Sequence, residues 1–593
     1  MASISKNKST AQSFGHNWVQ FVYDAYLYVF PTEYKEFRKP CHIISFAFSA
    51  FFVLGFSFYL YADWSMVFGS LSSFLKSTII FLLCAAITDV FVGFIYRFIN
   101  RFQPKLHAER KLSWFTNNRK SFLIVTGLIL LCWLPYMIAL FPGNCNLDTN
   151  DQIYQILGMR EKMWTLDSVI LLDDDVITHN YHPIFLTWVI KFFLKLGLAI
   201  GSSMTLGIAL MSFAQCICVA AVFSFTIWYM ARIGISRKFR IITFCFFAFF
   251  PLIPIYAMTI LKDSIYAPLT LLVAIGFLEL GRDTYGFLHD KRKCLSLAFF
   301  MFLSMLVRNN GSYVFIVAAP IMIFIFRKEW KRMALLMLVP LFIFTKIYSG
   351  MLLPALNIAS GPKREALSIP IQQIARLVKY HSDDLSEHDK EVISKVLCSG
   401  GSVEALGNRY DPEKSDNAKN FVDKYATTAD YIELFKVWGK HLFTHFGTYV
   451  EATLNNCYGY FFPGGSRLNY YWRFTKNSYG IQNYKPFDEA RNFLCSLPNQ
   501  MNQTPILFIF TNVTTYIWTM IICFVYLLVK KKFKYMPPFI IGIVLLLTCV
   551  ASPVNGLLRY VYALFLCAPL FIATIYMSVK QDRIQEAREK TQR

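Results

Sequence analysis

Long apolar runs recur along this chain and alternate with short polar segments. Residues 41–62, 77–97, 121–141 and 203–230 are each a run of about 20 or more mostly apolar residues with at most one or two charges. A helix of that length crosses a hydrocarbon core of roughly 30 Å. Soluble core helices rarely need such runs, so the pattern predicts an α-helical polytopic membrane protein.

The full set of candidate spans includes one segment that differs from the others. The candidates are 41–62, 77–97, 121–141, 182–200, 203–230, 239–259, 264–281, 294–308, 312–326, 333–349, 505–529, 537–552 and 560–579. Segment 182–200 carries Lys191 and Lys195 on one helical face, and charges that deep are costly in a spanning helix. We therefore expect an interfacial or re-entrant helix there, which leaves about twelve full spans.

The distribution of charge orients these helices. Lys and Arg number 59 against 37 Asp and Glu, a formal net charge of +22. The basic residues lie mainly in short loops and not on one soluble face, which argues against nucleic acid binding. If 182–200 does not span, one side holds both termini and the basic loops 98–120, 232–240, 282–293, 327–332 and 530–534. The positive-inside rule makes that side cytoplasmic, so we expect a multi-pass cell-membrane protein with both ends inside.

This topology divides the chain into membrane and external parts. The expected parts are a cytoplasmic segment 1–40, a transmembrane region 41–349 with a first external loop 142–202, an extracellular domain 350–504, C-terminal transmembrane helices 505–579 and a cytoplasmic tail 580–593. The stretch 350–504 has normal polar content and is long enough for a small folded domain, which we expect to be mainly helical.

The first external loop contains two acids suited to catalysis. Asp148 and Asp151 lie just beyond the end of a predicted membrane helix, and the apolar spacing within 150–160 predicts a helix on the membrane surface. A carboxylate there can accept a proton from a hydroxyl while a lipid-linked donor sits in the bilayer. The alternative for Asp148 is capping of that helix, because Asp and Asn are favoured N-caps.

Three cations are predicted at outer helix ends, where basic residues are normally scarce: Lys262, Arg308 and Arg559. A lipid phosphate sits at this depth, and Arg binds phosphate with two parallel hydrogen bonds. Each cation alone could instead reach lipid headgroups. Asp263 is either a second functional acid or the salt-bridge partner of Lys262. His182 either contacts substrate or caps the helix that follows it.

Several motifs occur in a fixed order on the predicted outer side. They are Pro-Gly and Asp-Thr-x-x-Gln within 142–152, His-Pro at 182–183, Leu-Lys-Asp-Ser at 261–264, Arg-Asn-Asn-Gly at 308–311, Ser-Ile-Pro-Ile-Gln-Gln-Ile-Ala-Arg at 368–376, Tyr-Gly-Tyr-Phe-Phe-Pro at 458–463 and Leu-Arg-Tyr at 558–560. Together they resemble the bacterial GT-C type polytopic glycosyltransferases, most closely a Gram-positive branch of that class. The resemblance covers roughly residues 120–580 and rests on the order of the motifs and their shared external location.

The resemblance implies an inverting transfer of a sugar from a polyprenyl-phosphate donor to a cell-envelope acceptor such as a teichoic acid, a polysaccharide or a glycolipid. By its place in the motif Asp148 is the general base on the acceptor hydroxyl, with Asp151 as second choice. The residues expected to bind substrate are Gln152, His182, Lys262, Asp263, Arg308, Asn309, Gln372, Arg376 and Arg559. A divalent metal ion assists some members of the class, but this sequence offers no convincing ligand set.

A transporter or a flippase for lipid-linked saccharides is the main alternative. Such proteins place paired charges or broken helices at mid-membrane. Here the predicted spans are mostly free of charge apart from Asp89 and Lys346, and the polar motifs cluster at outer helix ends. The sequence therefore favours a glycosyltransferase that works on the outer face.

Overall fold

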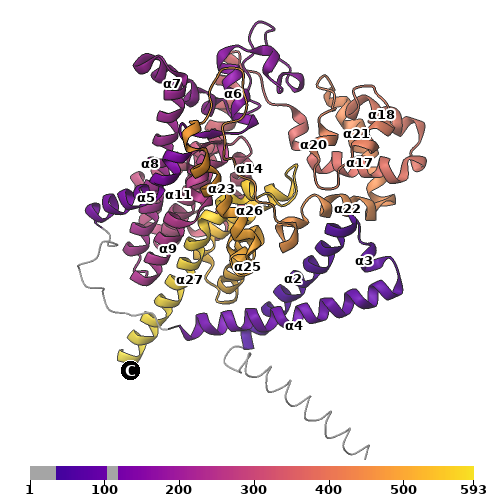
Figure 1. The fold of residues 1–593 in the computed structure, drawn as a ribbon. Helices are drawn as coiled ribbons and strands as arrows, with labels where there is room; N and C mark the ends of the chain where they lie inside the picture. Colours follow the sequence, from indigo (N-terminus) through magenta and orange to yellow (C-terminus); the bar gives the residue numbers. More distant parts are fainter. Residues whose placement is uncertain (1–34, 103–117, 593) are drawn as a thin grey trace, which may run out of the picture.

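A computed structural model describes residues 35–102 and 118–592, and within these residues the chain is mostly α-helical (Figure 1). Most of the predicted segment 1–40 and of the basic loop 98–120 lies outside the described residues. The helices pack into one large body, with a smaller helical domain beside it and a long helical hairpin along its edge.

The first half of the chain supplies most of the large body. Its helices are α2 (Lys35–Tyr61), α3 (Ser65–Phe68), α4 (Leu71–Arg101), α5 (Arg119–Ala139), α6 (Leu147–Leu157), α7 (Ile184–Gly201), α8 (Met204–Arg232), α9 (Arg237–Phe249), α10 (Leu252–Ala257), α11 (Lys262–Arg282), α12 (Thr284–His289), α13 (Lys291–Val307), α14 (Gly311–Ile325), α15 (Trp330–Phe342) and α16 (Leu353–Ala355). A π-helix, Ile343–Leu352, joins α15 to α16. The strands are β1 (Asn144–Cys145) and β2 (Thr259–Ile260).

The second half forms the smaller domain and then returns to the large body. Its helices are α17 (Ser368–His381), α18 (Glu387–Leu397), α19 (Val403–Arg409), α20 (Asp416–Lys419), α21 (Thr428–Thr444), α22 (Phe446–Asn455), α23 (Asp488–Gln503), α24 (Phe508–Thr511), α25 (Val513–Val529), α26 (Pro537–Val550) and α27 (Leu558–Gln592).

Eight helical stretches among the described residues are long and apolar enough to cross a membrane. They are α2, α4, α5, α7, α8, α11, the continuous stretch Arg327–Ala355 and α27 up to Glu589. Shorter apolar helices accompany them in α14, α25 and α26. The predicted class, a helical membrane protein, is confirmed. The eight include α7, the segment that we predict to lie at the interface.

The helices differ in how deeply they lie within the body. The apolar windows of α27 and α11 are 89% and 78% buried, whereas that of α4 is 17% buried, so α11 and α27 form the interior and α4 the periphery. Small residues allow the closest approaches between helices. A side chain at Gly197 would meet the backbone nitrogen of Gly207 at 2.2 Å, so α7 and α8 form a tightly packed hairpin.

The α2–α4 hairpin runs along the lower edge of the body in Figure 1 and reaches the smaller domain at the α3 end. Asp89, the acid within this predicted span, is paired with His42 at 2.9 Å and accepts a hydrogen bond from Ser45 at 3.3 Å. At the far end, the Asn455 side chain donates to the carbonyl of Ala62 at 2.7 Å. The contacts of Asp89 join α2 to α4, and Asn455 joins the α3 end of the hairpin to α22.

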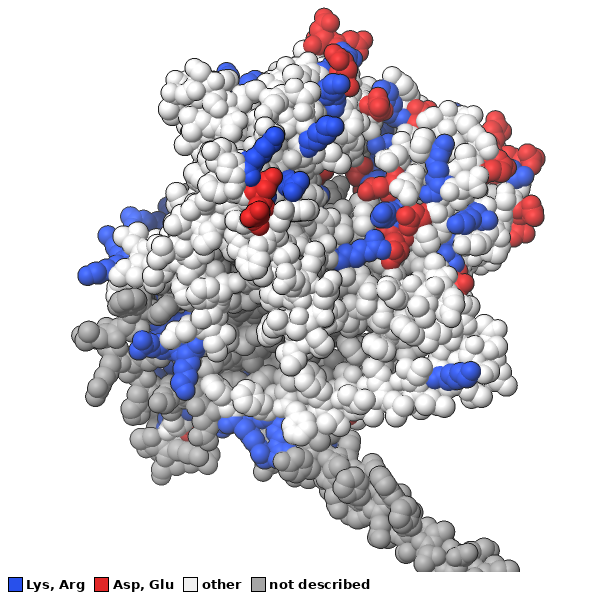
Figure 2. All heavy atoms as spheres, in the orientation of Figure 1, with Lys and Arg blue, Asp and Glu red and all other residues white. Residues whose placement is uncertain are grey.

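The smaller domain has a hydrophobic core of its own, built from buried residues between 371 and 449. It is narrower than the predicted domain 350–504. Cys457, Tyr460 and Cys495 pack into the core of the large body instead. Figure 2 shows that most of the acidic side chains on the visible face lie over this domain and at the top of the view, while the broad band below them is almost free of charge.

Candidate active site

A two-residue parallel pairing brings the starts of two distant helices together. Asn144 pairs with Thr259 and Cys145 with Ile260, so β1 and β2 run side by side in the same direction. Helix α6 begins two residues after β1, and α11 begins two residues after β2. Their first turns must therefore lie next to each other, although they are more than 100 positions apart in the sequence.

The Pro-Gly pair before β1 has a local structural reason. Gly143 has a φ of +136°, a conformation that side chains rarely adopt, and a Cβ there would meet the Ser212 hydroxyl at 2.0 Å. The Asn483 side chain donates to the Gly143 carbonyl at 3.0 Å. Glycine is therefore required at the turn that leads the chain into β1.

Asp148 lies in the first turn of α6 but does not cap that helix. The cap is Asn146, whose side-chain oxygen accepts the backbone N–H of Thr149 at 3.1 Å. The carboxylate of Asp148 is thereby left to face α11 and α27. Of the two alternatives that the sequence left open, the structure does not support capping.

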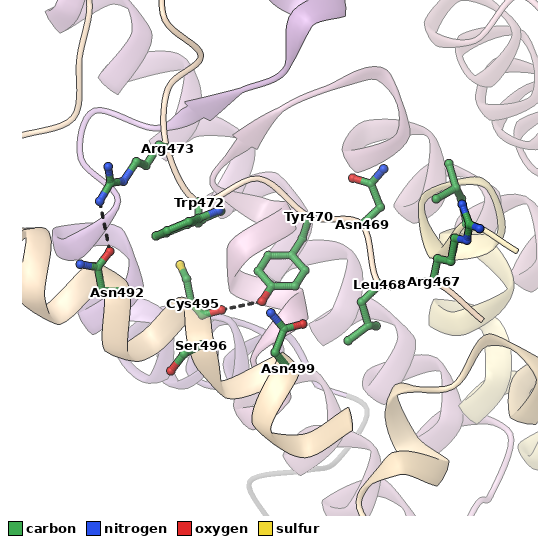
Figure 3. Close-up of a pocket in the computed structure, with 11 residues that line it drawn as sticks. Arg467, Leu468, Asn469, Tyr470, Trp472, Arg473, Asn492, Cys495, Ser496 and Asn499 are labelled. Carbon is green, nitrogen blue, oxygen red and sulfur yellow. Dashed lines mark hydrogen bonds between the residues drawn. The ribbon is translucent and has the colours of Figure 1, made fainter. Parts of the chain in front are cut away.

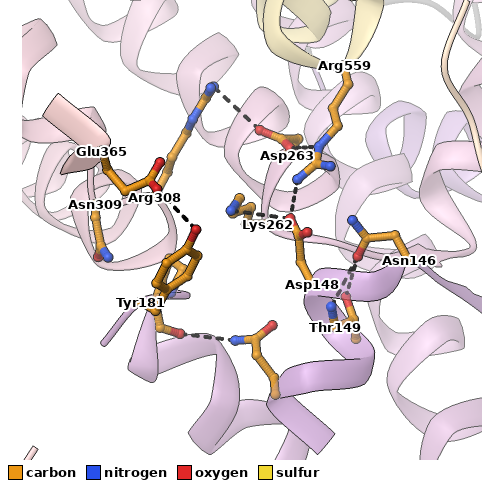
Figure 4. Close-up of polar contacts among 12 residues, drawn as sticks. Asn146, Asp148, Thr149, Tyr181, Lys262, Asp263, Arg308, Asn309, Glu365 and Arg559 are labelled. Carbon is orange, nitrogen blue, oxygen red and sulfur yellow. Dashed lines mark hydrogen bonds and ion pairs between the residues drawn. The ribbon is translucent and has the colours of Figure 1, made fainter. Parts of the chain in front are cut away.

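Five charged side chains meet at this point, and we call them the charge cluster: Asp148, Lys262, Asp263, Arg308 and Arg559 (Figure 4). Lys262 Nζ lies 3.3 Å from Asp148 Oδ2, and Arg559 donates to the same oxygen. On its other side Arg559 Nε donates to Asp263 Oδ2 at 2.6 Å, and Arg308 Nη1 lies 3.4 Å from Asp263 Oδ1. The five predicted residues come from α6, α11, the α13–α14 junction and α27.

The electrostatics of the charge cluster leave it with an excess of positive charge. Three cations face two carboxylates, and all five side chains are at most 23% exposed. Burial alone would raise the pKa of Asp148, but Arg559 and Lys262 hold it well below its usual range. Asp148 is therefore ionised at neutral pH and can accept a proton.

Aromatic rings line the charge cluster, and these were not predicted. The Tyr471 hydroxyl accepts a hydrogen bond from Arg559 Nη1 at 3.3 Å. The Arg308 guanidinium lies 5.1 Å from the ring centre of Tyr266 and 6.0 Å from that of Tyr560. Tyr560 was within a predicted motif, but Tyr471 and Tyr266 carry no signal that separates them from the other tyrosines of the chain.

His182 is a buried imidazole with unused hydrogen-bonding capacity. The residue is 4% exposed, and neither ring nitrogen has a hydrogen-bond partner among the described residues. Burial lowers its pKa to about 3, so the ring is neutral, and Asp148 is close enough to interact with it electrostatically. Buried polar atoms are normally satisfied. A neutral imidazole left unpaired beside the charge cluster is therefore suited to a polar ligand.

Asp151, the second predicted acid, points away from the charge cluster. The Thr165 hydroxyl donates to Asp151 Oδ2 at 2.5 Å and lies 3.0 Å from His179 Nε2. Burial raises the pKa of Asp151 to about 6 and lowers that of His179 to about 4. Asp151 thus ties α6 to the loop between α6 and α7.

Two further predicted residues also hold that loop. Gln152 donates to the Thr187 hydroxyl at 2.8 Å, which joins α6 to α7. Asn309 donates to the carbonyl of Asn180 at 2.9 Å, which joins the α13–α14 junction to the segment before α7. Both residues position the loop around the charge cluster, and their amide nitrogens are already engaged.

Gln372 and Arg376 lie in the smaller domain, outside the charge cluster. Gln372 donates to the carbonyl of Asp411 at 2.6 Å. Arg376 donates through Nε to Glu451 at 3.1 Å and through Nη1 to Tyr410 and to the Ala62 carbonyl, each at 3.2 Å. Their contacts hold the smaller domain together and attach it to the α2–α4 hairpin.

A hollow of about 570 Å³ lies behind the segment that carries Tyr471 (Figure 3). Trp472 and Arg473 line it from this segment, and Asn492 and Asn499 line it from α23. Arg473 lies over the Trp472 ring at 4.9 Å and donates to Asn492 at 3.3 Å. Leu557 completes one wall. Tyr470 and Trp472 line the hollow, whereas Tyr471 between them contacts Arg559, so this segment borders both the hollow and the charge cluster.

Fold and site together define a helical membrane protein with a buried charge cluster at the meeting point of several helix ends. A family model described as a family of unknown function, DUF6020, matches residues 35–592. The chain belongs to this family. No curated protein and no solved structure matches it.

Proposed function

We propose that this protein is a membrane glycosyltransferase that transfers a sugar from a polyprenyl-phosphate donor to a hydroxyl of a cell-envelope acceptor on the outer face. The observation that carries the proposal is the charge cluster: one ionised, partly accessible carboxylate beside three cations at helix ends. A base for the acceptor and a cradle for a phosphate are the two elements that this reaction needs.

In the proposed reaction Asp148 takes the proton of the acceptor hydroxyl. The hydroxyl oxygen forms a bond to the anomeric carbon of the sugar while the bond from that carbon to the phosphate oxygen breaks. The electron pair stays with the phosphate, and polyprenyl phosphate leaves. Attack from the face opposite the leaving group inverts the anomeric configuration.

The cations serve the leaving group. A sugar phosphodiester carries one negative charge, and the departing phosphate gains a second as the bond breaks. Arg308 and Arg559 offer the fork geometry that matches phosphate oxygens, and Lys262 adds a mobile point charge. The cluster has one positive charge in excess, which suits an anionic ligand.

Donor binding would also change the base. The pKa of Asp148 is low because Arg559 and Lys262 pair with it, whereas its burial acts in the opposite direction. When the donor phosphate pairs with Arg559 and Lys262, these cations no longer stabilise the Asp148 carboxylate to the same extent. Burial then dominates, and the pKa of Asp148 rises. The carboxylate then becomes a stronger base only when the donor is bound.

The hollow behind Tyr471 supports a saccharide as the second substrate. Trp472 is 43% exposed and offers an aromatic face, and the amides of Asn492 and Asn499 stand opposite it (Figure 3). An apolar face ringed by a few polar groups is the usual composition of a small-molecule site. We infer that this hollow holds part of the acceptor, a teichoic acid, polysaccharide or glycolipid, while lipid tails of the donor remain in the membrane.

The proposed topology has about twelve spans, α7 at the interface and both termini in the cytoplasm. Two observations support it. Lys191 and Lys195 are both exposed on α7, where they would face lipid if that helix crossed the membrane. Most of the acidic side chains visible in Figure 2 lie toward the top of the view and over the smaller domain, at the end of the molecule opposite the C-terminus.

The direct test uses purified full-length protein in nanodiscs with a panel of polyprenyl-phosphate sugars, each supplied with cell-envelope saccharides as acceptors. We expect loss of one donor and an equal release of polyprenyl phosphate. Proteoliposomes with the same donors separate the alternative: translocation of an intact donor without release of polyprenyl phosphate would instead establish a flippase.

A further inference from the structure

Three side chains that bind metals in other proteins meet at one corner of the smaller domain, at the end of α17. His381 ends α17, and Asp384 ends the short helical turn Ser382–Asp384 that follows it. His445 lies between α21 and α22. His381 and Asp384 are close in the sequence, and the fold brings His445, about 60 positions further on, next to them.

The distances between the ligand atoms suit a small metal ion. Asp384 Oδ2 lies 3.4 Å from His381 Nδ1 and 3.7 Å from His445 Nε2. One ligand atom from each residue lies within 4.8 Å of the other two. Ligands on a tetrahedral zinc ion, at bond lengths of about 2.0–2.1 Å, stand roughly 3.4 Å apart. The two edges that meet at Asp384 already match, and the third, between the two imidazoles, is the one that rotation of the His445 ring would have to shorten.

The surroundings of His381 are those of a metal ligand. The Thr448 hydroxyl lies 3.0 Å from His381 Nε2, the ring nitrogen that faces away from Asp384. Metal-binding histidines nearly always have such a partner on the second nitrogen, because it fixes the orientation of the ring. Nδ1 is thereby directed at Asp384 and His445.

The two imidazoles lie next to each other, with Asp384 beside both. Their ring centres are 4.7 Å apart, and His441 stacks on His445 at 5.6 Å. His381 and Thr448 also line a hollow of about 410 Å³, which gives water access to this corner.

We propose that His381, Asp384 and His445 bind one divalent transition-metal ion of the zinc type, with water as a further ligand. Two imidazoles and one carboxylate suit Zn²⁺, Co²⁺ or Ni²⁺, whereas Mg²⁺ and Ca²⁺ prefer oxygen ligands alone. The ion would fasten the end of α17 to the α21–α22 junction. The site is separate from the charge cluster and does not depend on the proposed transfer reaction.

Cobalt binding provides the test, because Co²⁺ in such a site absorbs visible light. Full-length protein in detergent, without a polyhistidine tag, is stripped with a chelator and titrated with Co²⁺. We expect about one bound ion per chain, displaced by Zn²⁺ and not by Mg²⁺. His445→Ala and Asp384→Asn should each weaken Co²⁺ binding more than tenfold.

His388→Ala is the matched control, since His388 is an exposed histidine on the neighbouring α18. His388→Ala should bind Co²⁺ as the unaltered chain does. Zn²⁺ should raise the unfolding temperature of His388→Ala and of the unaltered chain, but not that of His445→Ala or Asp384→Asn. Asp384→Asn preserves side-chain volume and gives the decisive result if His445→Ala does not fold. Absence of Co²⁺ binding to the unaltered chain, or equal binding in Asp384→Asn, would overturn the proposal.

Discussion

Two buried arginine sites in this protein look alike in the sequence and differ in the structure. Arg559 belongs to the charge cluster, where three cations share two carboxylates. Arg376 in the smaller domain faces Glu451, Tyr410 and a backbone carbonyl. Both were predicted to bind substrate. The first site has positive charge in excess, and the second has a carboxylate, a hydroxyl and a carbonyl already in place around one guanidinium.

Under the proposed function, this difference is the one between a binding site and a structural contact. A buried ion pair with all its donors used holds two parts of a fold together, and breaking it is costly. A group of buried charges with unequal numbers can exchange its internal partners for those of a ligand. His182 strengthens this contrast, because both of its ring nitrogens are unpaired within the described residues beside the charge cluster.

The largest expected effect comes from Asp148→Asn. Removal of the base should lower the rate of sugar transfer by about a thousandfold, since general bases contribute roughly 10²–10⁴. The asparagine is close to isosteric, so thermal unfolding of the purified protein should still show one cooperative transition. Transfer at more than a tenth of the normal rate would remove Asp148 from the proposed mechanism.

A second experiment compares the two arginine sites directly. Arg559→Lys retains the charge but loses the fork that matches phosphate. It should weaken binding of a polyprenyl monophosphate at least tenfold, measured by thermophoresis in detergent.

The matched control for that experiment is Arg376→Lys, the same substitution in the other site. It should lower the unfolding temperature while leaving affinity for the polyprenyl monophosphate within about twofold, because Arg376 already has protein partners. Equal losses of affinity in both variants would show that the contrast between the sites is false.

A third substitution tests whether the hollow behind Tyr471 holds part of the acceptor, as proposed. Trp472→Ala removes the aromatic face and should raise KM for the saccharide acceptor about fivefold with little change in kcat, as expected for about 1 kcal/mol of contact. Trp330→Ala is the control, since Trp330 is an exposed tryptophan on α15. An unchanged KM in Trp472→Ala would separate the hollow from the substrate path.

Much of the helical architecture could be predicted from apolar runs. Where a predicted run differs from the observed helices, the cause is local. The run 239–259 breaks at Pro251 into α9 and α10 and ends in β2. The run 333–349 continues as a π-helix into α16. Hydropathy records how apolar a segment is, but not where a proline or a change of hydrogen-bonding pattern divides it.

The charge cluster was predictable because its members lie at helix ends, a position that hydropathy locates well. The partners of each side chain were not. Asp148 and Asp151 lie three residues apart on α6, yet one faces cations and the other faces Thr165. Which face of a short helix meets which neighbour depends on the β1–β2 pairing, and two residues per strand leave no readable pattern.

Asp151→Asn has the smallest expected effect on catalysis and provides the sharpest control for Asp148→Asn. Transfer should stay within about threefold of normal, because the Asp151 carboxylate faces Thr165 and not the charge cluster. A loss as large as that of Asp148→Asn would mean that the loop, and not one base, determines activity.

The same variant should alter how acid affects the stability of residues 147–182. His179 and His182 have pKa values lowered to about 4 and about 3, so stability that they contribute near pH 7 is lost as pH falls. The pKa of Asp151 is raised to about 6, so its protonation between pH 7 and 5 opposes that loss by about 1.4 kcal/mol. Asparagine cannot supply this compensation. The measurement is hydrogen exchange of residues 147–182 at pH 7 and pH 5, corrected for intrinsic rates. On going from pH 7 to pH 5, exchange should accelerate about tenfold more in Asp151→Asn than in the unaltered chain. Identical pH dependence in the two proteins would show that the Asp151 carboxyl does not titrate in this range.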